Sequence, residues 1–132
     1  MKKVIAIILI IVFLIVIGGA IAFNVMSKKS ENELANVVIT DVDLSKIPDG
    51  KYEGGSSIFP VSVKLEVTVQ NHKITNIKII KHDNARGAKA EILTQKVIMA
   101  QSLNVDVISG ATTSSKAILK AIEIALNNGI NQ

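Results

Sequence analysis

The chain has 132 residues, of which 48% are hydrophobic and only 3% aromatic, and its formal net charge is +4. A chain of this length predicts one small domain together with an N-terminal segment. Lys2, Lys3, Lys28 and Lys29 flank an apolar run and supply the excess positive charge, because the remainder holds 11 basic and 11 acidic residues. Since that remainder has no basic cluster, we expect no nucleic-acid partner and place the flanking lysines at membrane lipid headgroups.

The apolar run from Val4 to Ser27 contains no charge. As a helix it would be about 36 Å long, enough to cross a hydrocarbon core of roughly 30 Å. Ala20-Ile21-Ala22 resembles a signal-cleavage site, but the apolar stretch continues to Met26 and exceeds the usual signal core of about 7–15 residues. We therefore expect a retained anchor rather than a cleaved signal. The slight excess of positive charge at the N-terminus predicts a cytoplasmic N-terminus and an extracytoplasmic domain.

Three regions follow from this pattern. Residues 1–29 are predicted to form the transmembrane anchor with basic flanks, residues 30–47 a polar spacer, and residues 48–132 the folded domain. The spacer is expected to continue the anchor helix briefly before it becomes a loop. The domain is placed after Ile47-Pro48-Asp49-Gly50, a sequence typical of a turn.

Two strands and two helices are predicted within the domain. Apolar and polar residues alternate strictly from Val61 to Gln70, which indicates a strand with one buried face. After a tight turn at Asn71-His72, a second strand runs to about Lys81. One helix is expected at about 88–101 and another from about Thr113 to the closing Asn127-Asn128-Gly129. The expected inward positions of the helices are Ile92, Leu93, Val97 and Ala100, then Ile118, Ile122, Ala125 and Leu126. Strands followed by helices, without alternation, predict an α+β fold: a small antiparallel sheet packed with two to three helices, preceded by one transmembrane helix.

The run from Asp106 to Ser115 holds several hydroxyls where a turn enters the last helix. Serine and threonine before a helix are commonly N-caps, and spacing alone favours Thr113 or Ser114 in that role. A helix start also binds phosphate well, because its backbone N–H groups lack partners. No base stands beside Thr112 in the sequence, and the only two histidines, His72 and His82, are expected at the surface rather than on a metal.

The stretch from about Gly50 to Gly129 resembles the small FMN-binding domain family. Related domains occur in flavin subunits of the sodium-pumping NADH:quinone reductase and in membrane-anchored extracellular electron carriers. Asp49 to Gly54 is similar to the family's opening strand, Val63 to Ile80 to its hairpin, and Ala100 to Thr112 to its flavinylation region.

In that family a flavin transferase recognises Asp-x-x-Ser/Thr-Gly-Ala-Thr/Ser and transfers FMN from FAD to the final hydroxyl. The resemblance implies that Thr112 carries FMN through a phosphoester, framed by Asp106, Ser109, Gly110 and Ala111. Thr113 is the neighbouring hydroxyl, one place out of register. Tyr52 is a candidate contact for the flavin ring, with a core tyrosine at a strand start as the alternative.

The resemblance implies a membrane-anchored, extracytoplasmic flavoprotein that carries electrons rather than an enzyme with its own substrate. Its expected partners are the flavin transferase, membrane lipid and a membrane redox protein such as a quinone-linked dehydrogenase. The alternative is an unflavinylated or non-covalent flavin-binding or sensory module at the membrane surface. Two segments depart from the family: residues 82–87 replace a longer glycine-rich loop, and residues 56–60 lack a common glycine pair.

Overall fold

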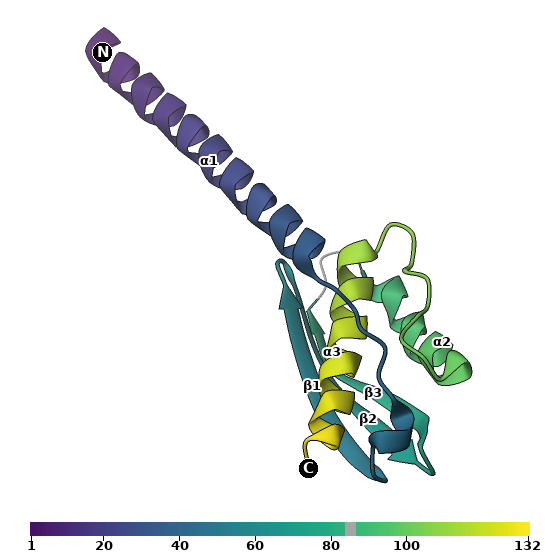
Figure 1. The fold of residues 1–132 in the computed structure, drawn as a ribbon. Coiled ribbons are helices and arrows are strands. Elements are labelled where there is room, and N and C mark those ends of the chain that lie inside the picture. The colour runs from purple at the N-terminus through teal and green to yellow at the C-terminus, as the bar shows by residue number, and fades with distance from the viewer. Residues whose placement is uncertain (84–86) are drawn as a thin grey trace. The chain divides into compact units, whose positions relative to one another are not determined.

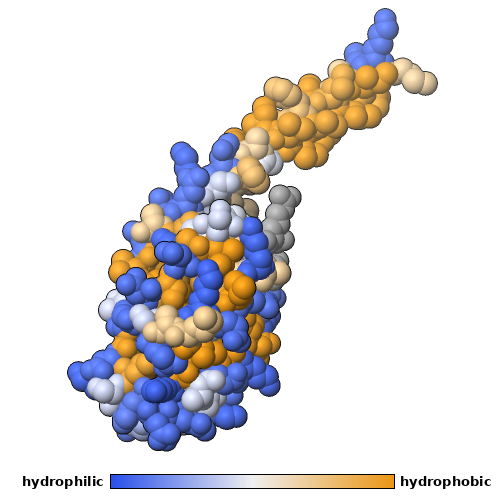
Figure 2. All heavy atoms as spheres, turned by 90° about the vertical axis from the view of Figure 1, so that its right-hand side faces the viewer, coloured by the Kyte–Doolittle hydropathy of each residue, from blue (hydrophilic) through white to orange (hydrophobic). Residues whose placement is uncertain are grey.

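The computed structural model describes residues 1–83 and 87–132. The chain divides into two compact units, Met1–Asn32 and Glu33–Gln132. The first unit consists of most of helix α1 (Lys2–Asn36), which buries none of its side chains within the chain. It is long and apolar enough to be a candidate membrane span. Figure 2 shows the continuous apolar surface of this helix, interrupted by polar residues only towards its ends.

The second unit is built on a three-stranded antiparallel sheet in the order β1-β2-β3 (Figure 1). The strands are β1 (Gly50–Ile58), β2 (Val61–Gln70) and β3 (Lys73–Asp83). Asn71 and His72 connect β2 to β3 with φ angles of 51° and 59°, so the predicted hairpin turn is confirmed. The register of β3 against β2 shifts between Thr68 and Val69, which explains why Ile74 and Ile77, three positions apart, both lie inward.

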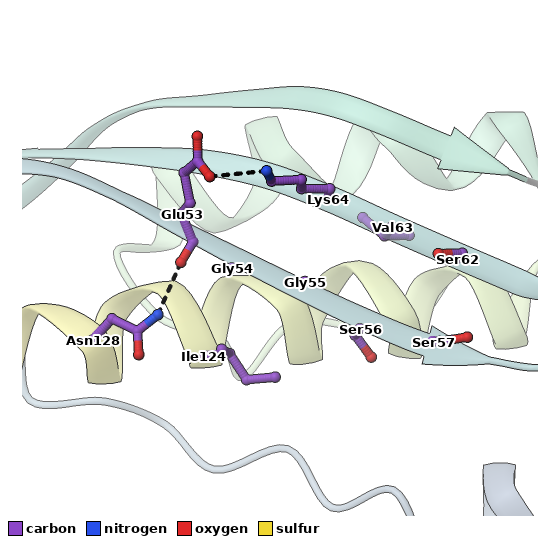
Figure 3. Close-up of a pocket in the computed structure, with 10 residues that line it drawn as sticks. All are labelled: Glu53, Gly54, Gly55, Ser56, Ser57, Ser62, Val63, Lys64, Ile124 and Asn128. Atoms are coloured by element: carbon purple, nitrogen blue, oxygen red, sulfur yellow. Dashed lines mark hydrogen bonds and ion pairs between the residues drawn. The ribbon is translucent and has the colours of Figure 1, made fainter.

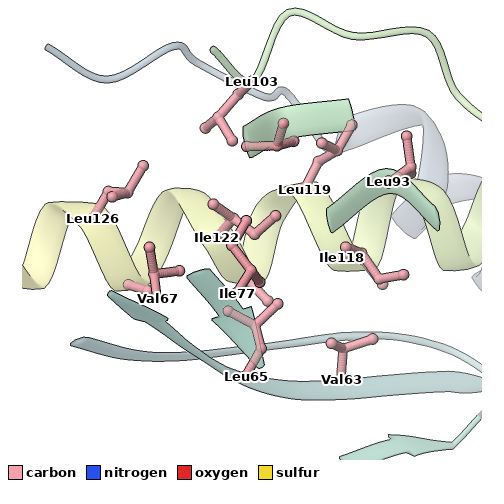
Figure 4. Packing of buried hydrophobic residues seen from close by; sticks show 14 of the residues in the cluster. Val63, Leu65, Val67, Ile77, Leu93, Leu103, Ile118, Leu119, Ile122 and Leu126 are labelled. Carbon is pink, nitrogen blue, oxygen red and sulfur yellow. The ribbon is translucent and has the colours of Figure 1, made fainter. Parts of the chain in front are cut away.

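The helices cover one face of this sheet and bury a single apolar core. Every odd-numbered residue of β2 from Val61 to Val69 is buried, as the alternation predicted. These side chains pack against Ile118, Ile122 and Leu126 of α3 (Thr112–Ile130) (Figure 4). The opposite face of the sheet carries ion pairs such as Lys64–Glu53, 3.0 Å, and remains exposed. The predicted α+β class is therefore confirmed.

The first predicted helix differs from expectation in form and in orientation. It begins as a 3₁₀ helix, η2 (Ala88–Ile92), and continues as α2 (Leu93–Ala100). Leu93 and Val97 are buried as predicted, but Ile92 and Ala100 are exposed, because the change of helical type rotates the faces.

Helix α3 also extends past its predicted end. Gly129 lies inside the helix rather than closing it, and a Cβ there would come within 2.8 Å of Ile47 and 3.0 Å of Tyr52. Gly129 is thus used for a close approach between α3 and the start of the domain.

Residues 37–47, which we call the strap, lie along the polar stripe of α3, the side of the helix that includes Lys120 and Glu123. The Lys120 ammonium donates to the Val38 carbonyl oxygen at 3.1 Å, and the Thr40 N–H donates to the Glu123 carboxylate at 3.1 Å. Ile39, Val42 and Leu44 are half-buried against the core, and Ile47 is completely buried. The segment read from sequence as a spacer therefore packs onto the domain.

Asp41 fastens the strap to the chain between α2 and α3. Its carboxylate accepts hydrogen bonds from the Ser102 hydroxyl at 2.6 Å and the Leu103 N–H at 3.0 Å. Burial by itself raises the pKa of Asp41, but the bonds from Leu103, Ser102 and the Val42 N–H outweigh it and hold the pKa below the ordinary value of 3.8. The carboxylate form is therefore the one that the fold stabilises.

Candidate functional site

The predicted recognition sequence, Asp106 to Thr112, forms an exposed loop ahead of α3 that is held by its own hydrogen bonds. Val105 and Ile108 are half-buried against the core, whereas Asp106 projects into solvent. The chain then turns tightly, with the Ala111 N–H donating to the Ile108 carbonyl oxygen at 2.9 Å. Gly110 takes a φ of +76°, a conformation that glycine adopts without strain. The loop thus displays its polar residues and Val107, and it holds Val105 and Ile108 against the domain.

The buried side chain of Ser115 holds this turn in place through two hydrogen bonds. Its hydroxyl accepts from the Ile108 N–H at 3.0 Å and donates to the Ala111 carbonyl oxygen at 2.7 Å. The side chain is completely buried, so it ties both ends of the turn without contact with water. Sequence reasoning did not single out Ser115, because a serine after Thr-Thr-Ser looks like any other helix-start hydroxyl.

Thr112 is the first residue of α3 and is exposed. The N-cap is Ala111, which makes no side-chain cap, so the expectation that Thr113 or Ser114 caps the helix was wrong. The hydroxyl-bearing residues lie inside the first turn instead, one to three places beyond the cap. In this geometry the N–H groups of Thr112, Thr113 and Ser114 have no acceptor within the helix.

A small hollow of about 220 Å³ lies at this helix start. It is lined by residues of the β1–β2 turn, the loop before η2 and the motif itself: Pro60, Val61, Gly87, Gly110, Ala111, Thr112, Thr113 and Ser114. Part of the segment 82–87, where the sequence departs from the family, lies outside the described residues. The hollow thus brings together the Thr112 hydroxyl, Gly110 of the motif and the N–H groups of the first turn of α3.

Lys89 supplies positive charge at the same place. A Cβ built on Gly110 would come within 2.9 Å of the Lys89 ammonium nitrogen, so the ammonium lies directly over the turn. Lys89 belongs to η2 and is exposed. Together with the positive end of the α3 dipole, this cation favours an anion at Thr112.

The side chain of His82 is buried, so the expectation of a surface histidine was wrong for its imidazole. Its side chain is only 2% exposed, and its Nδ1 lies 2.9 Å from the Glu91 carboxylate. Its Nε2 lies 3.1 Å from the Ser114 hydroxyl oxygen. Neither contact has a local sequence signal, because Ser114 is 32 positions away and only folding brings β3 to α3.

Tyr52 is not brought to the motif. Its ring packs beside Gly129, and its hydroxyl donates to the Pro48 carbonyl oxygen at 2.7 Å. Gly129 is 17 residues from Thr112 on the same helix, a separation of about 26 Å. The structure therefore brings together Asp106, Ser109, Gly110, Ala111, Thr112 and Thr113, and leaves Tyr52 in the core at the far end of α3.

A larger and more open groove of about 530 Å³ lies between β1 and the C-terminal half of α3 (Figure 3). Gly54 and Gly55 are among the residues that line it, and Asn128 donates to the Glu53 carbonyl oxygen at 3.0 Å at one end. The groove meets α3 at Ile124, about 18 Å along the helix from Thr112. It is a separate feature from the helix-start hollow.

The domain has two α+β layers and a Ser-Gly-Ala-Thr turn at a helix start, and comparison with known proteins identifies its class as a flavin-binding domain. The family model for the FMN-binding domain matches residues 60–127, about half of the chain. The chain belongs to this family, and it is a flavoprotein that binds FMN. The match includes β2, β3, α2, the motif and most of α3.

Two curated relatives are longer proteins. The chain is 30% identical over 82 residues to an uncharacterized protein of Treponema pallidum (strain Nichols), covering 60% of this chain and 23% of that protein. It is 32% identical over 98 residues to the NADH:acrylate oxidoreductase of Vibrio harveyi, covering 72% of this chain and 9% of that protein. The chain thus spans less than a quarter of either relative, so their remaining domains have no counterpart in the match.

Proposed function

We propose that the chain carries FMN covalently on Thr112 and passes electrons through it as a membrane-anchored, extracytoplasmic carrier. The observation that carries this proposal is the exposed Thr112 hydroxyl, held at the first position of α3 by a fixed and exposed recognition turn. Membership of the FMN-binding family supports the cofactor. The candidate span α1 supports the anchor.

The modification is a phosphoryl transfer that a flavin transferase would catalyse with FAD. The Thr112 hydroxyl oxygen forms a bond to the phosphorus of the FMN moiety, and the bond from that phosphorus to the pyrophosphate bridging oxygen breaks. AMP leaves with the bridging oxygen, and the hydroxyl proton is released. The product is a phosphodiester that keeps one negative charge beside the start of α3.

The residues at the helix start fit that charge. A helix N-terminus stabilises an exposed anion by about 0.3–1 kcal/mol, and free N–H groups can donate to its oxygens. The Lys89 ammonium over Gly110 adds a second favourable interaction. No acidic side chain lines the hollow among the residues that the structure describes.

The size of the hollow bears on what the domain does with the flavin. Pockets that enclose a ligand have volumes of roughly 300–1,000 Å³, whereas this hollow has about 220 Å³. It suits the phosphate and part of the ribityl chain, and the isoalloxazine ring would remain largely open to a redox partner. Bound flavin supplies the redox chemistry, while the protein keeps it in place. A membrane redox protein such as a quinone-linked dehydrogenase is the proposed donor.

The proposal is tested by producing the full chain with and without a flavin transferase. Protein from the first host should stay yellow after denaturation and gain the mass of one FMN moiety. Thr112→Ala should abolish both signals, whereas Thr113→Ala, which removes the neighbouring hydroxyl, should keep them. Thr112→Ser should also be modified, because serine offers the same nucleophile.

Three outcomes would contradict the proposal. If wild-type protein from the host with the flavin transferase is unmodified, covalent attachment is refuted. If flavin is lost on denaturation, its binding is non-covalent. Covalent flavin retained in Thr112→Ala would identify another acceptor. Domain folding in each variant is checked by the fluorescence of Tyr52, the only tyrosine in a chain without tryptophan.

A further inference from the structure

Three side chains from three elements form a hydrogen-bonded row that ends in the helix-start hollow. Glu91 of η2 contacts His82 Nδ1 at 2.9 Å, and His82 Nε2, at the end of β3, contacts the Ser114 hydroxyl at 3.1 Å. Ser114 is two residues after Thr112 and lines the hollow. The His82 side chain and Ser114 are each 2% exposed, whereas the Glu91 side chain is 48% exposed. The row therefore joins a buried hydroxyl at the site to a carboxylate near solvent.

The carboxylate of Glu91 determines which imidazole nitrogen carries a proton. An ionised carboxylate only accepts hydrogen bonds, so His82 Nδ1 must be the N–H donor. In the neutral imidazole Nε2 is then bare and accepts the hydroxyl proton of Ser114. In the imidazolium Nε2–H donates to Ser114, and the hydroxyl proton is free to point elsewhere. The protonation of His82 thus decides whether Ser114 presents lone pairs or a proton to the hollow.

An anion at Thr112 favours the second arrangement. Its negative charge attracts both the imidazolium and an outward-pointing Ser114 proton, and the buried position of His82 limits screening by water. Among the residues that the structure describes, Glu91 on η2 contacts the imidazole, while Lys89 on η2 and the dipole of α3 lie at the helix start. On the histidine's own strand, Asp83 is paired with Lys81 at 3.0 Å.

We propose that His82, backed by Glu91, is a positioning residue that turns the Ser114 hydroxyl to donate to a phosphate group held at Thr112. This inference rests on the proposed function for the identity of the phosphate. It adds a buried donor, Ser114, and the histidine behind it to the exposed ammonium of Lys89. Its physical content is a coupling: negative charge at position 112 and a second proton on His82 stabilise each other.

The two histidines of the chain make this coupling directly measurable. Long-range proton–nitrogen NMR of the imidazoles will show two rings, His82 and His72, and His72 is an exposed control at the β2–β3 turn. At one and the same pH we expect the bare-nitrogen signal of His82 to be weaker in flavinylated than in unflavinylated protein, with the His72 signals unchanged.

A pair of variants tests the coupling without flavin. Thr112→Glu places a carboxylate at the exposed first position of α3, and Thr112→Gln is its neutral counterpart of the same size. At the same pH we expect the bare-nitrogen signal of His82 to be weaker in Thr112→Glu than in Thr112→Gln. Ser114→Ala in the Thr112→Glu background should restore the bare nitrogen, whereas Thr113→Ala should not.

The outcomes separate this inference from the proposed function. If wild-type protein gains no FMN mass but Thr112→Glu still protonates His82, the proposed function fails and the positioning role stands. If FMN is attached but His82 is equally protonated with and without it, the positioning role is refuted and the attachment stands. If Ser114→Ala in the Thr112→Glu background leaves the His82 signal unchanged, the positioning role of His82 is also refuted, because the Ser114 hydroxyl would then not transmit the charge.

Discussion

The strand β1 and the helix α3 approach each other closely at Gly54, and replacing this residue with alanine should destabilise the domain strongly. A Cβ at Gly54 would overlap the carbonyl oxygen of Ala121 and lie only 2.6 Å from the N of Ala125. Both obstacles are helix backbone, which cannot move aside as the end of a flexible side chain can. Overpacking a tight core costs about 1–3 kcal/mol, and we expect Gly54→Ala to cost about 3 kcal/mol.

Gly55→Ala is the matched control on the same strand. A Cβ at Gly55 would meet only the Val63 carbonyl oxygen, at 3.5 Å, which is an ordinary contact. Alanine also loses less backbone entropy than glycine on folding, so this variant should be neutral or more stable by up to about 1 kcal/mol. Adjacent glycines are thus predicted to differ in the sign of their effect.

Urea unfolding of the unflavinylated full chain in mild detergent, followed by Tyr52 fluorescence, measures both effects. Tyr52 is 5% exposed, and its emission reports on the domain alone, since the chain has no other tyrosine and no tryptophan. At a typical slope of about 1–3 kcal/mol per molar urea, a loss of 3 kcal/mol lowers the midpoint by roughly 1–3 M. Equal midpoints for the two alanine variants would refute the close β1–α3 contact.

Three further predictions concern the strap and the turn from Ile108 to Ala111. Because the pKa of Asp41 is lowered in the folded state, its carboxylate stabilises the domain above pH 3.8 and this contribution is lost as the pH falls further. The stability difference between wild type and Asp41→Asn should therefore shrink below pH 3.8; a difference independent of pH would contradict the strap contact. Glu123→Ala leaves the Thr40 N–H unpaired and should cost about 1–3 kcal/mol and speed hydrogen exchange in the strap, unlike Asn104→Ala at an exposed position. Ser115→Ala removes both ties of the turn and should cost about 1–3 kcal/mol; it should also slow flavinylation, and an unchanged rate would show that the turn needs no tie.

The predicted recognition sequence, Asp106 to Thr112, shows how much of the candidate site can be identified from the amino-acid sequence. The motif from Asp106 to Thr112 is contiguous, so its resemblance to the family identified the acceptor candidate and the frame without any tertiary information. The structure added the residues that surround this motif. Ser115 hydrogen-bonds to both ends of the turn, the Lys89 ammonium lies close to Gly110, and His82 contacts Ser114. These residues come from η2, β3 and α3, and no local pattern predicts their meeting.

The amino-acid sequence by itself determined the elements whose signal is periodic. Strict alternation along β2 and helical spacing along α3 predicted which face of each is buried, because both patterns arise from backbone geometry within one element. The same spacing could not predict that the strap covers the polar stripe of α3. The tertiary structure decided this, since the stripe meets the strap through bonds such as Thr40 to Glu123, 83 positions apart. Burial of His82 and the place of Gly129 inside α3 were decided in the same way, because each depends on a partner from a distant element rather than on neighbours in the chain.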